Sequence, residues 1–280
     1  MNNETANPIR LVVVDWAGTT IDFGSQAPAA AFTSVFAARG IEVSGDESRA
    51  PMGLNKREHL IAMLRQPEIA KRWREVYQKD WTEDDIDAMY HEFVPLQLKA
   101  IEQFAQLVPQ LTETVQQLRD RNLQIAGTTG YFRAAAEAVA ERAAAAGFVP
   151  DTNICADDVP QGRPAPWMIY RAMERLGVYP PAAVVKVGDT VADIQSGLSA
   201  GCWSIGVCDS SSLTGLSVEQ FAALTEDQRR DQLAQTAAAF RAAGSHAVID
   251  SIADLPALID TINARSLEYP QVIDPVSATL

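Results

Sequence analysis

The sequence predicts an α/β fold: a Rossmann-like parallel sheet with helices on both faces and an inserted all-helical cap domain. Two observations carry this prediction. Short apolar runs rich in β-branched residues alternate with longer amphipathic stretches, as they do in β-α-β units. Residues 28–104 break the alternation, because they contain helical patterns and no convincing strand, and a connection of that length is too long for one crossover.

The strands are predicted from runs that are short, apolar and bounded by Gly, Asp or Thr. The first run, residues 10–15, is continuous and β-branched, as expected for a strand buried on both faces. The others are predicted at residues 123–127, 153–155, 184–188, 203–207 and 246–249. Because helical stretches separate them, these strands should form a parallel sheet through right-handed crossovers.

The helices between the strands have recognisable ends. They are predicted at residues 109–121, 133–146, 166–176, 191–200 and 252–262. Gly147, Gly177 and Gly201 each follow one of them, at the position where a helix commonly ends in a left-handed residue. Within the helical interval, Thr82 is followed at once by acidic residues, which marks a helix start.

These elements divide the chain into three parts. Residues 1–24 and 105–265 should form the α/β core, and residues 25–104 should form a helical cap over the carboxyl ends of the strands. Residues 266–280 should be a peripheral tail. A ligand site is therefore expected in the cleft between cap and core.

Composition narrows the classes of function. The 280 residues carry a formal net charge of -13, which argues against a nucleic-acid surface because such surfaces gather Lys and Arg. The first apolar run, residues 11–14, is far shorter than a signal-peptide core or a membrane span. The cysteines show no CxxC spacing, which suggests a reducing compartment. We therefore expect a cytoplasmic protein that binds neither nucleic acid nor membrane.

Acidic side chains stand at the ends of two predicted strands. Asp15 ends the first strand, Asp189 follows the strand at 184–188, and Asp193 lies in the first turn of the next helix. Carboxylates gathered at one edge of a parallel sheet are the hard oxygen ligands that Mg²⁺ prefers. Asp15 alone could equally cap the segment that follows it. Together the carboxylates predict a Mg²⁺ site, which would offset repulsion between an anionic nucleophile and an anionic phosphorus group.

Groups suited to an anion accompany these carboxylates. Thr128 and Thr129 end the second predicted strand where a helix begins, so they offer hydroxyl and backbone donors. Arg163, in a Gln-Gly-Arg-Pro loop, can supply a fixed cation to phosphorus-bound oxygens. The alternatives are an ordinary N-cap for Thr128 and a solvated loop residue for Arg163.

In this order, the features resemble the signatures of the haloacid dehalogenase superfamily. They are Asp15, Thr129, Arg163, and Gly188-Asp189 with Asp193. The resemblance implies a haloacid dehalogenase-like core with Asp15 as a nucleophile that becomes an aspartyl-phosphate. It also implies that Asp15, the backbone carbonyl of Ala17 and Asp189 hold Mg²⁺, while Asp193 orients loops or metal-bound waters.

Ala17 departs from the phosphatases of that superfamily. They usually carry a second aspartate two residues after the nucleophile, which protonates the leaving alkoxide, and a methyl group cannot donate a proton. Lys56 offers another way to handle the leaving group. It follows Asn55, a predicted N-cap, so it should lie in the first turn of a helix, where the helix dipole and burial lower the pKa of an amine.

A neutral Lys56 amine could condense with an aldehyde. The protonated imine would act as an electron sink, so that breaking a carbon–phosphorus bond leaves an enamine and needs no acid at Ala17. His59, three residues after Lys56, lies on the same helix face and could move protons. The alternatives are a solvated helix lysine and a structural histidine.

Longer stretches resemble the phosphonoacetaldehyde hydrolase (phosphonatase) family. They are Asp15-Trp-Ala-Gly-Thr-Thr, Pro51-Met-Gly-Leu with Lys56 and His59, Thr128-Thr-Gly-Tyr131, residues 157–164, and Lys186-Val-Gly-Asp-Thr190. The resemblance implies hydrolysis of phosphonoacetaldehyde to acetaldehyde and phosphate by a homodimer, through a Lys56 Schiff base and an Asp15 aspartyl-phosphate. It also implies that Met52, Gly53 and Tyr131 line the substrate pocket.

Two other functions stay open. A phosphatase or phosphomutase acting on O-phosphate esters would use the same core, and Ala17 argues against it. The second is a non-catalytic binding protein on the same fold, although every charged group needed for catalysis is present. Ser25 is a further departure, because relatives can carry a cysteine there, so no role for a thiol carries over.

Overall fold

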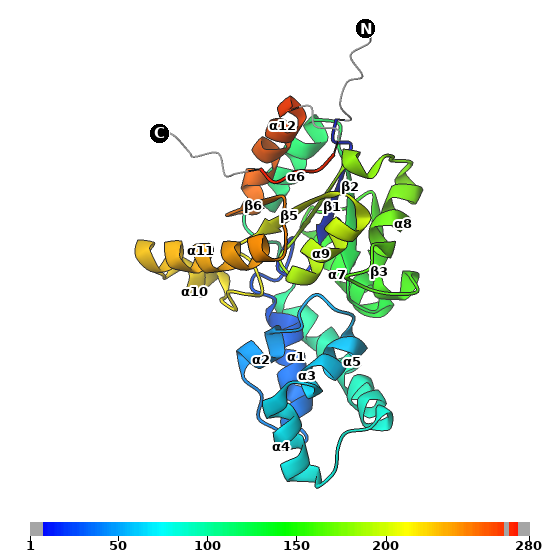
Figure 1. Cartoon of the computed structure of the whole chain (residues 1–280), viewed down its shortest axis with the longest axis vertical. Coiled ribbons are helices and arrows are strands. Elements are labelled where there is room, and N and C mark those ends of the chain that lie inside the picture. Colours follow the sequence, from blue (N-terminus) through cyan, green and yellow to red (C-terminus); the bar gives the residue numbers. More distant parts are fainter. Residues whose placement is uncertain (1–7, 266–268, 274–280) are drawn as a thin grey trace.

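The computed structural model describes residues 8–265 and 269–273, and its centre is a sheet of six parallel strands (Figure 1). The strands are β1 (Leu11–Asp15), β2 (Gln124–Thr129), β3 (Thr152–Cys155), β4 (Val184–Gly188), β5 (Trp203–Val207) and β6 (Ala247–Ile249). Their order in the sheet is β3-β2-β1-β4-β5-β6. Every predicted strand is confirmed to within two residues at each end.

The strand order reverses between β1 and β4, and the reversal decides where a ligand can bind. β1 ends at Asp15, and its parallel neighbour β4 leads directly into Asp189. In open α/β sheets the loops that follow the strands on either side of such a reversal form the ligand crevice. The topology therefore brings Asp15 and Asp189, far apart in the sequence, to one place.

Alternate side chains of the strands pack into separate cores on the two faces of the sheet. In β1, Val12 and Val14 belong to the larger core, whereas Leu11 and Val13 belong to a second core. None of these four side chains is more than 3% exposed. The prediction of a strand buried on both faces is confirmed.

Helices cover both faces of the sheet (Figure 1). They are α6 (Leu111–Asp120), α7 (Arg133–Ala145), α8 (Trp167–Leu176), α9 (Val191–Ala200), α10 (Val218–Ala222), α11 (Glu226–Ala242) and α12 (Leu255–Arg265). Gly177 and Gly201 end α8 and α9 in the left-handed conformation, as predicted. The predicted helix at 252–262 is a 3₁₀ turn followed by α12. Within the described residues, no helix has the length and apolar character needed to cross a membrane.

Residues 26–104, here called the helical insertion, form a separate group of helices beside one end of the sheet (Figure 1). They are α1 (Gln26–Ala37), α2 (Gly45–Arg49), α3 (Lys56–Leu64), α4 (Pro67–Tyr77) and α5 (Glu83–Phe104). Thr82 caps α5 as predicted, because its side chain accepts a hydrogen bond from the backbone N–H of Asp85. The buried side chains of the insertion continue the larger core of the sheet, and among them Phe32 of α1 stacks on Phe93 of α5 with ring centroids 4.4 Å apart.

The two chain segments that join the insertion to the sheet domain run side by side. The backbone N–H of Asp22 donates to the carbonyl of Gln106 at 2.9 Å, and that of Val108 donates to the carbonyl of Thr20 at 2.9 Å. These paired segments are the two chain connections between the helical insertion and the sheet domain. The predicted division into a core and a cap of residues 25–104 stays a prediction.

The predicted tail, residues 266–280, lies partly outside the described residues. In its described part, residues 269–273, the backbone N–H of Ile273 donates to the carbonyl of His246 at 2.6 Å. The Ile273 side chain is only 5% exposed. This short segment therefore lies beside the start of β6.

Candidate active site

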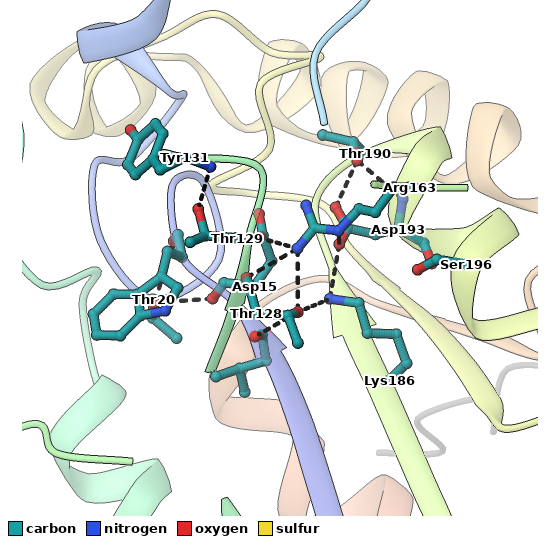
Figure 2. Close-up of polar contacts among 12 residues, drawn as sticks. Asp15, Thr20, Thr128, Thr129, Tyr131, Arg163, Lys186, Thr190, Asp193 and Ser196 are labelled. Carbon is teal, nitrogen blue, oxygen red and sulfur yellow. Dashed lines mark hydrogen bonds and ion pairs between the residues drawn. The ribbon is translucent and has the colours of Figure 1, made fainter. Parts of the chain in front are cut away.

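Asp15, at the end of β1, belongs to a buried cluster of polar side chains (Figure 2). Its Oδ1 accepts a hydrogen bond from Arg163 Nη2 at 2.5 Å, and the same nitrogen donates to the carbonyl of Thr128 at 2.9 Å. Burial raises the pKa of the Asp15 carboxyl, and the Arg163 guanidinium opposes that shift. The arginine thus helps to keep a buried carboxylate ionised.

Asp189, directly after β4, gathers with Asp15 and Asp193, and oxygens of the three carboxylates lie within 4.8 Å of one another. Its Oδ2 accepts a hydrogen bond from the backbone N–H of Ser212 at 2.8 Å, whereas its Oδ1 is buried without a partner among the described residues. Burial, and then repulsion from Asp15 and Asp193, raises the pKa of Asp189 well above its usual range. A divalent cation would relieve this repulsion and give Oδ1 a partner, so the residues fit a metal ion.

Asp193 differs from the other two carboxylates because protein groups occupy its oxygens. Lys186 Nζ lies 2.7 Å from Oδ1, Arg163 Nε lies 3.2 Å from the same atom, and Thr190 Oγ1 donates to Oδ2 at 2.5 Å (Figure 2). Burial alone would raise the pKa of Asp193, but Arg163 and Lys186 outweigh burial and hold the pKa below its usual range. Asp193 is therefore placed to orient two cations.

Lys186 is a second buried cation in the cluster, and it was not predicted as a site residue. It comes from the middle of β4, is 1% exposed, and also donates to the carbonyl of Val187 at 3.1 Å. A signal was present in the sequence, because a lysine inside a strand buried on both faces requires a charged partner. The pattern could not say that the partner is Asp193.

Lys56 brings the helical insertion to the same site. It is the first residue of α3, and the predicted N-cap, Asn55, accepts a hydrogen bond from the backbone N–H of Glu58 at 2.9 Å. Lys56 is 5% exposed, and its Nζ lies 4.9 Å from the centre of the Tyr131 ring. Burial lowers the pKa of Lys56 to about 8, although the Asp15 carboxylate opposes this shift. An amine with an accessible neutral form therefore lies in the same pocket as Asp15.

Known proteins resemble this chain over almost its full length. Residues 9–201 match the family of haloacid dehalogenase-like hydrolases. The chain is 43% identical to a phosphonoacetaldehyde hydrolase of Syntrophobacter fumaroxidans, over 94% of this chain and 95% of that relative. It is 44% identical to a phosphonoacetaldehyde hydrolase of Hahella chejuensis, over 91% of this chain and 87% of that relative. The chain belongs to the phosphonoacetaldehyde hydrolase family.

A solved structure has the same architecture. The crystal structure of a phosphonoacetaldehyde hydrolase-like protein from Oleispira antarctica is 37% identical and superposes with a TM-score of 0.92, over 95% of this chain and 96% of that one. The predicted family and fold class, and the prediction that the chain is a hydrolase, are confirmed. Haloacid dehalogenase-like hydrolases generally use a divalent metal ion, and the cluster of three aspartates could bind one.

In the present chain, most of the predicted site residues surround one small pocket between the sheet domain and the helical insertion. The predicted residues that line it are Asp15, Ala17, Met52, Gly53, Lys56, Thr129, Tyr131 and Arg163. Its cavity volume of about 20 Å³ leaves room for one or two water molecules. A substrate of several heavy atoms needs more space than this arrangement of the insertion and the sheet domain leaves.

His59 stands behind the pocket wall. Its Nε2 lies 2.8 Å from the carbonyl of Ser48, and its ring stacks on Phe32 with centroids 3.7 Å apart. Because a carbonyl only accepts, Nε2 carries a proton and Nδ1 is left as an acceptor without a partner among the described residues. Burial, and then the charge of Lys56, lowers the pKa of His59 well below its usual range. His59 is therefore a neutral imidazole.

Thr128 also lies behind the pocket. Its hydroxyl donates to the carbonyl of Val14 at 3.3 Å and accepts from Arg163 Nη2 at 3.2 Å (Figure 2). The residue thus holds Arg163 in place and does not face the cavity. Its neighbour Thr129 lines the pocket, and its hydroxyl accepts a hydrogen bond from the backbone N–H of Tyr131 at 3.1 Å.

Two glycines let the insertion and the sheet domain approach each other closely. A Cβ added at Gly130 would lie 2.7 Å from the carbonyl oxygen of Leu54, and one added at Gly53 would collide with the side chain of Thr190. Gly53 has a φ of +95°, which side-chain-bearing residues rarely adopt. Gly130 was not predicted as a site residue, although it directly follows Thr129 at the strand end.

Proposed function

We propose that this chain hydrolyses phosphonoacetaldehyde to acetaldehyde and phosphate by cleaving the carbon–phosphorus bond. The observation that carries the proposal is the pocket shared by Lys56 and Asp15, a buried amine with a pKa of about 8 and a carboxylate at a strand end. A small molecule with an aldehyde at one end and a phosphonate at the other matches these two groups. Ala17 adds support, because an ester substrate would need a proton donor there.

The first proposed step is imine formation. The neutral Lys56 amine attacks the aldehyde carbon, and loss of water gives a protonated imine. With a pKa of about 8, about a tenth of the amine is neutral at pH 7. His59, on the same helix, is proposed to take up and return the proton through Nδ1, an acceptor that has no partner among the described residues.

The second proposed step breaks the carbon–phosphorus bond. An oxygen of Asp15 attacks phosphorus, and the electron pair of the breaking bond moves into the imine to give an enamine, so that no free carbanion forms. Protonation of the enamine carbon and hydrolysis of the imine release acetaldehyde from Lys56. Water then attacks the aspartyl-phosphate and releases phosphate. One water is lost and two are consumed, which balances the overall hydrolysis.

The remaining pocket residues are proposed to bind and enclose the substrate. Arg163 and Thr129 would hold the phosphonate oxygens, and the guanidinium is well suited because its ion pairs fix its orientation. Met52, Gly53 and Tyr131 would surround the two-carbon part and keep water from the imine.

Mg²⁺ is the proposed metal. Asp15, the backbone carbonyl of Ala17 and Asp189 would hold it, while Asp193 stays with its cations. The support is the chemistry of the donors: hard oxygens at a strand edge, with Oδ1 of Asp189 buried and unpartnered within the described residues. When bound, the ion supplies the positive charge that lets an anionic carboxylate approach an anionic phosphonate.

The proposed assembly is a cytoplasmic homodimer in which residues 25–104 act as a closing cap. The surface around α8 supports a dimer, because Trp167 and Tyr170 of α8 are 45% and 37% exposed and Tyr179, in the loop after α8, is 78% exposed. Large aromatic side chains exposed together are typical of protein interfaces. The described cysteines are all free thiols, in keeping with a reducing compartment.

Borohydride trapping tests the imine. The protein is treated with sodium borohydride with and without phosphonoacetaldehyde, and the modified residue is located by mass spectrometry. We expect a substrate-dependent adduct on Lys56 that is absent from Lys56→Arg, with the exposed Lys71 as an internal control. If Lys56→Arg released phosphate at the wild-type rate, the reaction would not need the imine and the imine step would be refuted. Faster phosphate release from O-phosphate esters than from phosphonoacetaldehyde would favour a phosphatase instead.

A further inference from the structure

Three consecutive serines after β5 are buried, although the proposed mechanism uses none of them. Ser210, Ser211 and Ser212 are 1%, 0% and 1% exposed. Serine is mostly an exposed residue type, so a buried run of serines needs partners for its hydroxyl and backbone groups. We call residues 209–216 the serine loop. Its partners lie at the aspartate cluster on one side and in the helical insertion on the other.

On the core side, the serine loop fixes Asp189 at two points. Ser211 Oγ donates to the backbone carbonyl of Asp189 at 2.6 Å, and the backbone N–H of Ser212 donates to Asp189 Oδ2 at 2.8 Å. In addition, Ser210 Oγ donates to the carbonyl of Gly18 at 2.7 Å. With its main chain and one oxygen held, Asp189 presents its other oxygen to the aspartate cluster.

At its far end, the same loop touches the helical insertion. The carbonyl of Gly215 accepts hydrogen bonds from Gln26 Nε2 at 3.1 Å and from Arg49 Nη2 at 3.3 Å. The Arg49 guanidinium covers Gly215 so closely that an added Cβ would lie 2.8 Å from its central carbon. Arg49 ends α2 in the insertion, whereas Gly215 follows the sheet strand β5. The Arg49 contact therefore requires the insertion to lie against the sheet domain.

We propose that the serine loop couples closure of the helical insertion to the position of the Asp189 carboxylate, with Arg49 and Ser211 as positioning residues. This inference rests on the proposed function, because it needs Asp189 to hold a metal ion. When the insertion moves away, Gly215 loses the Arg49 donor, and the loop that holds Asp189 loses an anchor. Closure and metal binding then strengthen each other by the same factor, since coupling between two sites is reciprocal.

The test measures Mn²⁺ binding to the full chain by electron paramagnetic resonance. No substrate is present, so the readout does not depend on turnover. Ser211→Ala removes one bond to Asp189 and should weaken Mn²⁺ binding about fivefold. Arg49→Ala should weaken it about threefold, although Arg49 does not belong to the aspartate cluster. The double variant should lose about fivefold rather than about fifteenfold, because both residues act along one path.

Two control variants match these changes in chemistry. Arg74→Ala removes an exposed arginine of α4, and Ser204→Ala removes a buried hydroxyl that donates to a backbone carbonyl at 2.8 Å. Both should bind Mn²⁺ as the wild type does. Should Ser211→Ala fail to fold, Gln26→Ala removes the other side-chain donor to the loop and should weaken Mn²⁺ binding as Arg49→Ala does.

Each outcome separates this inference from the proposed function. Wild-type Mn²⁺ affinity in Arg49→Ala, or effects of Arg49 and Ser211 that simply multiply, would overturn the coupling while leaving the hydrolysis proposal intact. The expected coupling in a protein that releases no phosphate from phosphonoacetaldehyde would support the coupling and count against the proposed substrate alone.

Discussion

Replacing Lys56 by methionine is expected to abolish turnover and at the same time to make the protein more stable. Methionine keeps the length and the apolar stem of the side chain but carries no charge. Lys56 is 5% exposed, so its ammonium group loses most of its contact with water in the folded state. The substitution therefore removes a buried charge without opening a large cavity.

The magnitude follows from the pKa. Burial lowers the pKa of Lys56 from 10.5 to about 8, and a tenfold change in protonation equilibrium is about 1.4 kcal/mol, so the charged side chain costs about 3 kcal/mol below pH 8. The ammonium also lies 4.9 Å and 5.7 Å from the ring centres of Tyr131 and Phe32, contacts that contribute about 1 kcal/mol. The net gain for Lys56→Met is about 2 kcal/mol, or about 4 to 8 °C in Tm.

The dependence on pH has a fixed sign. Because the folded pKa is the lower one, the unfolded chain binds more protons between about pH 8 and pH 10.5, and the wild type gains stability as pH rises through that window. Lys56→Met has no such proton to lose. Its advantage should be complete at pH 7 and should shrink as the pH approaches about 10.

Differential scanning calorimetry at about pH 7 and about pH 10, with a chelator present to exclude metal binding, measures this difference. Lys71→Met is the matched control, because Lys71 is exposed on α4 and its replacement should change stability by less than about 0.5 kcal/mol. If Lys56→Met unfolds at or below the wild-type temperature at pH 7, or if its advantage does not vary with pH, the account of a desolvated amine is wrong.

Three further outcomes are expected. Gly130→Ala places a methyl group against the carbonyl of Leu54 and should push the helical insertion away from the sheet domain, so steady-state kinetics should show kcat/KM lowered about a hundredfold. Chelation should stop phosphate release and added Mg²⁺ should restore it, with Asp189→Asn requiring a higher Mg²⁺ concentration in the same phosphate assay. The pH profile of kcat/KM should rise toward about pH 8 and then level off, as the Lys56 amine becomes neutral.

The central part of the site could be predicted because strand ends in a parallel sheet meet at one edge. Asp15 and Asp189 each stand at the end of a run of buried residues, so the pattern places both at one edge of the sheet, and the strand order brings them together. Lys56 required another kind of inference. Asn55 predicted that a helix starts at Lys56. The burial of the Lys56 side chain depends on how the insertion packs against the sheet domain, which no local sequence pattern specifies.

What escaped prediction depends on contacts between distant segments. Ser211 and Ser212 follow β5 in a stretch that reads as an ordinary polar loop, and only the packed sheet brings them to Asp189. Gly130 matters because Leu54, which is far away in sequence in the loop before α3, lies opposite it. Serine and glycine are common in loops, so their identity alone cannot separate a loop residue from a positioning one.

The buried charges explain why an alanine at position 17 suits the proposed chemistry. The cluster contains three carboxylates and two cations, Asp15, Asp189, Asp193, Arg163 and Lys186. The net charge of the cluster is thus -1. Binding a divalent ion would change this charge to +1, and adding a phosphonate dianion would return it to -1. A protonated Lys56 imine would then make the whole site neutral. If an aspartate replaced Ala17, the site that contains the metal ion, the phosphonate and the imine would carry one uncompensated negative charge. Burying such a charge costs several kcal/mol. In the proposed mechanism, the imine would therefore replace both the proton donor and the charge balance that an acid at position 17 would have to provide.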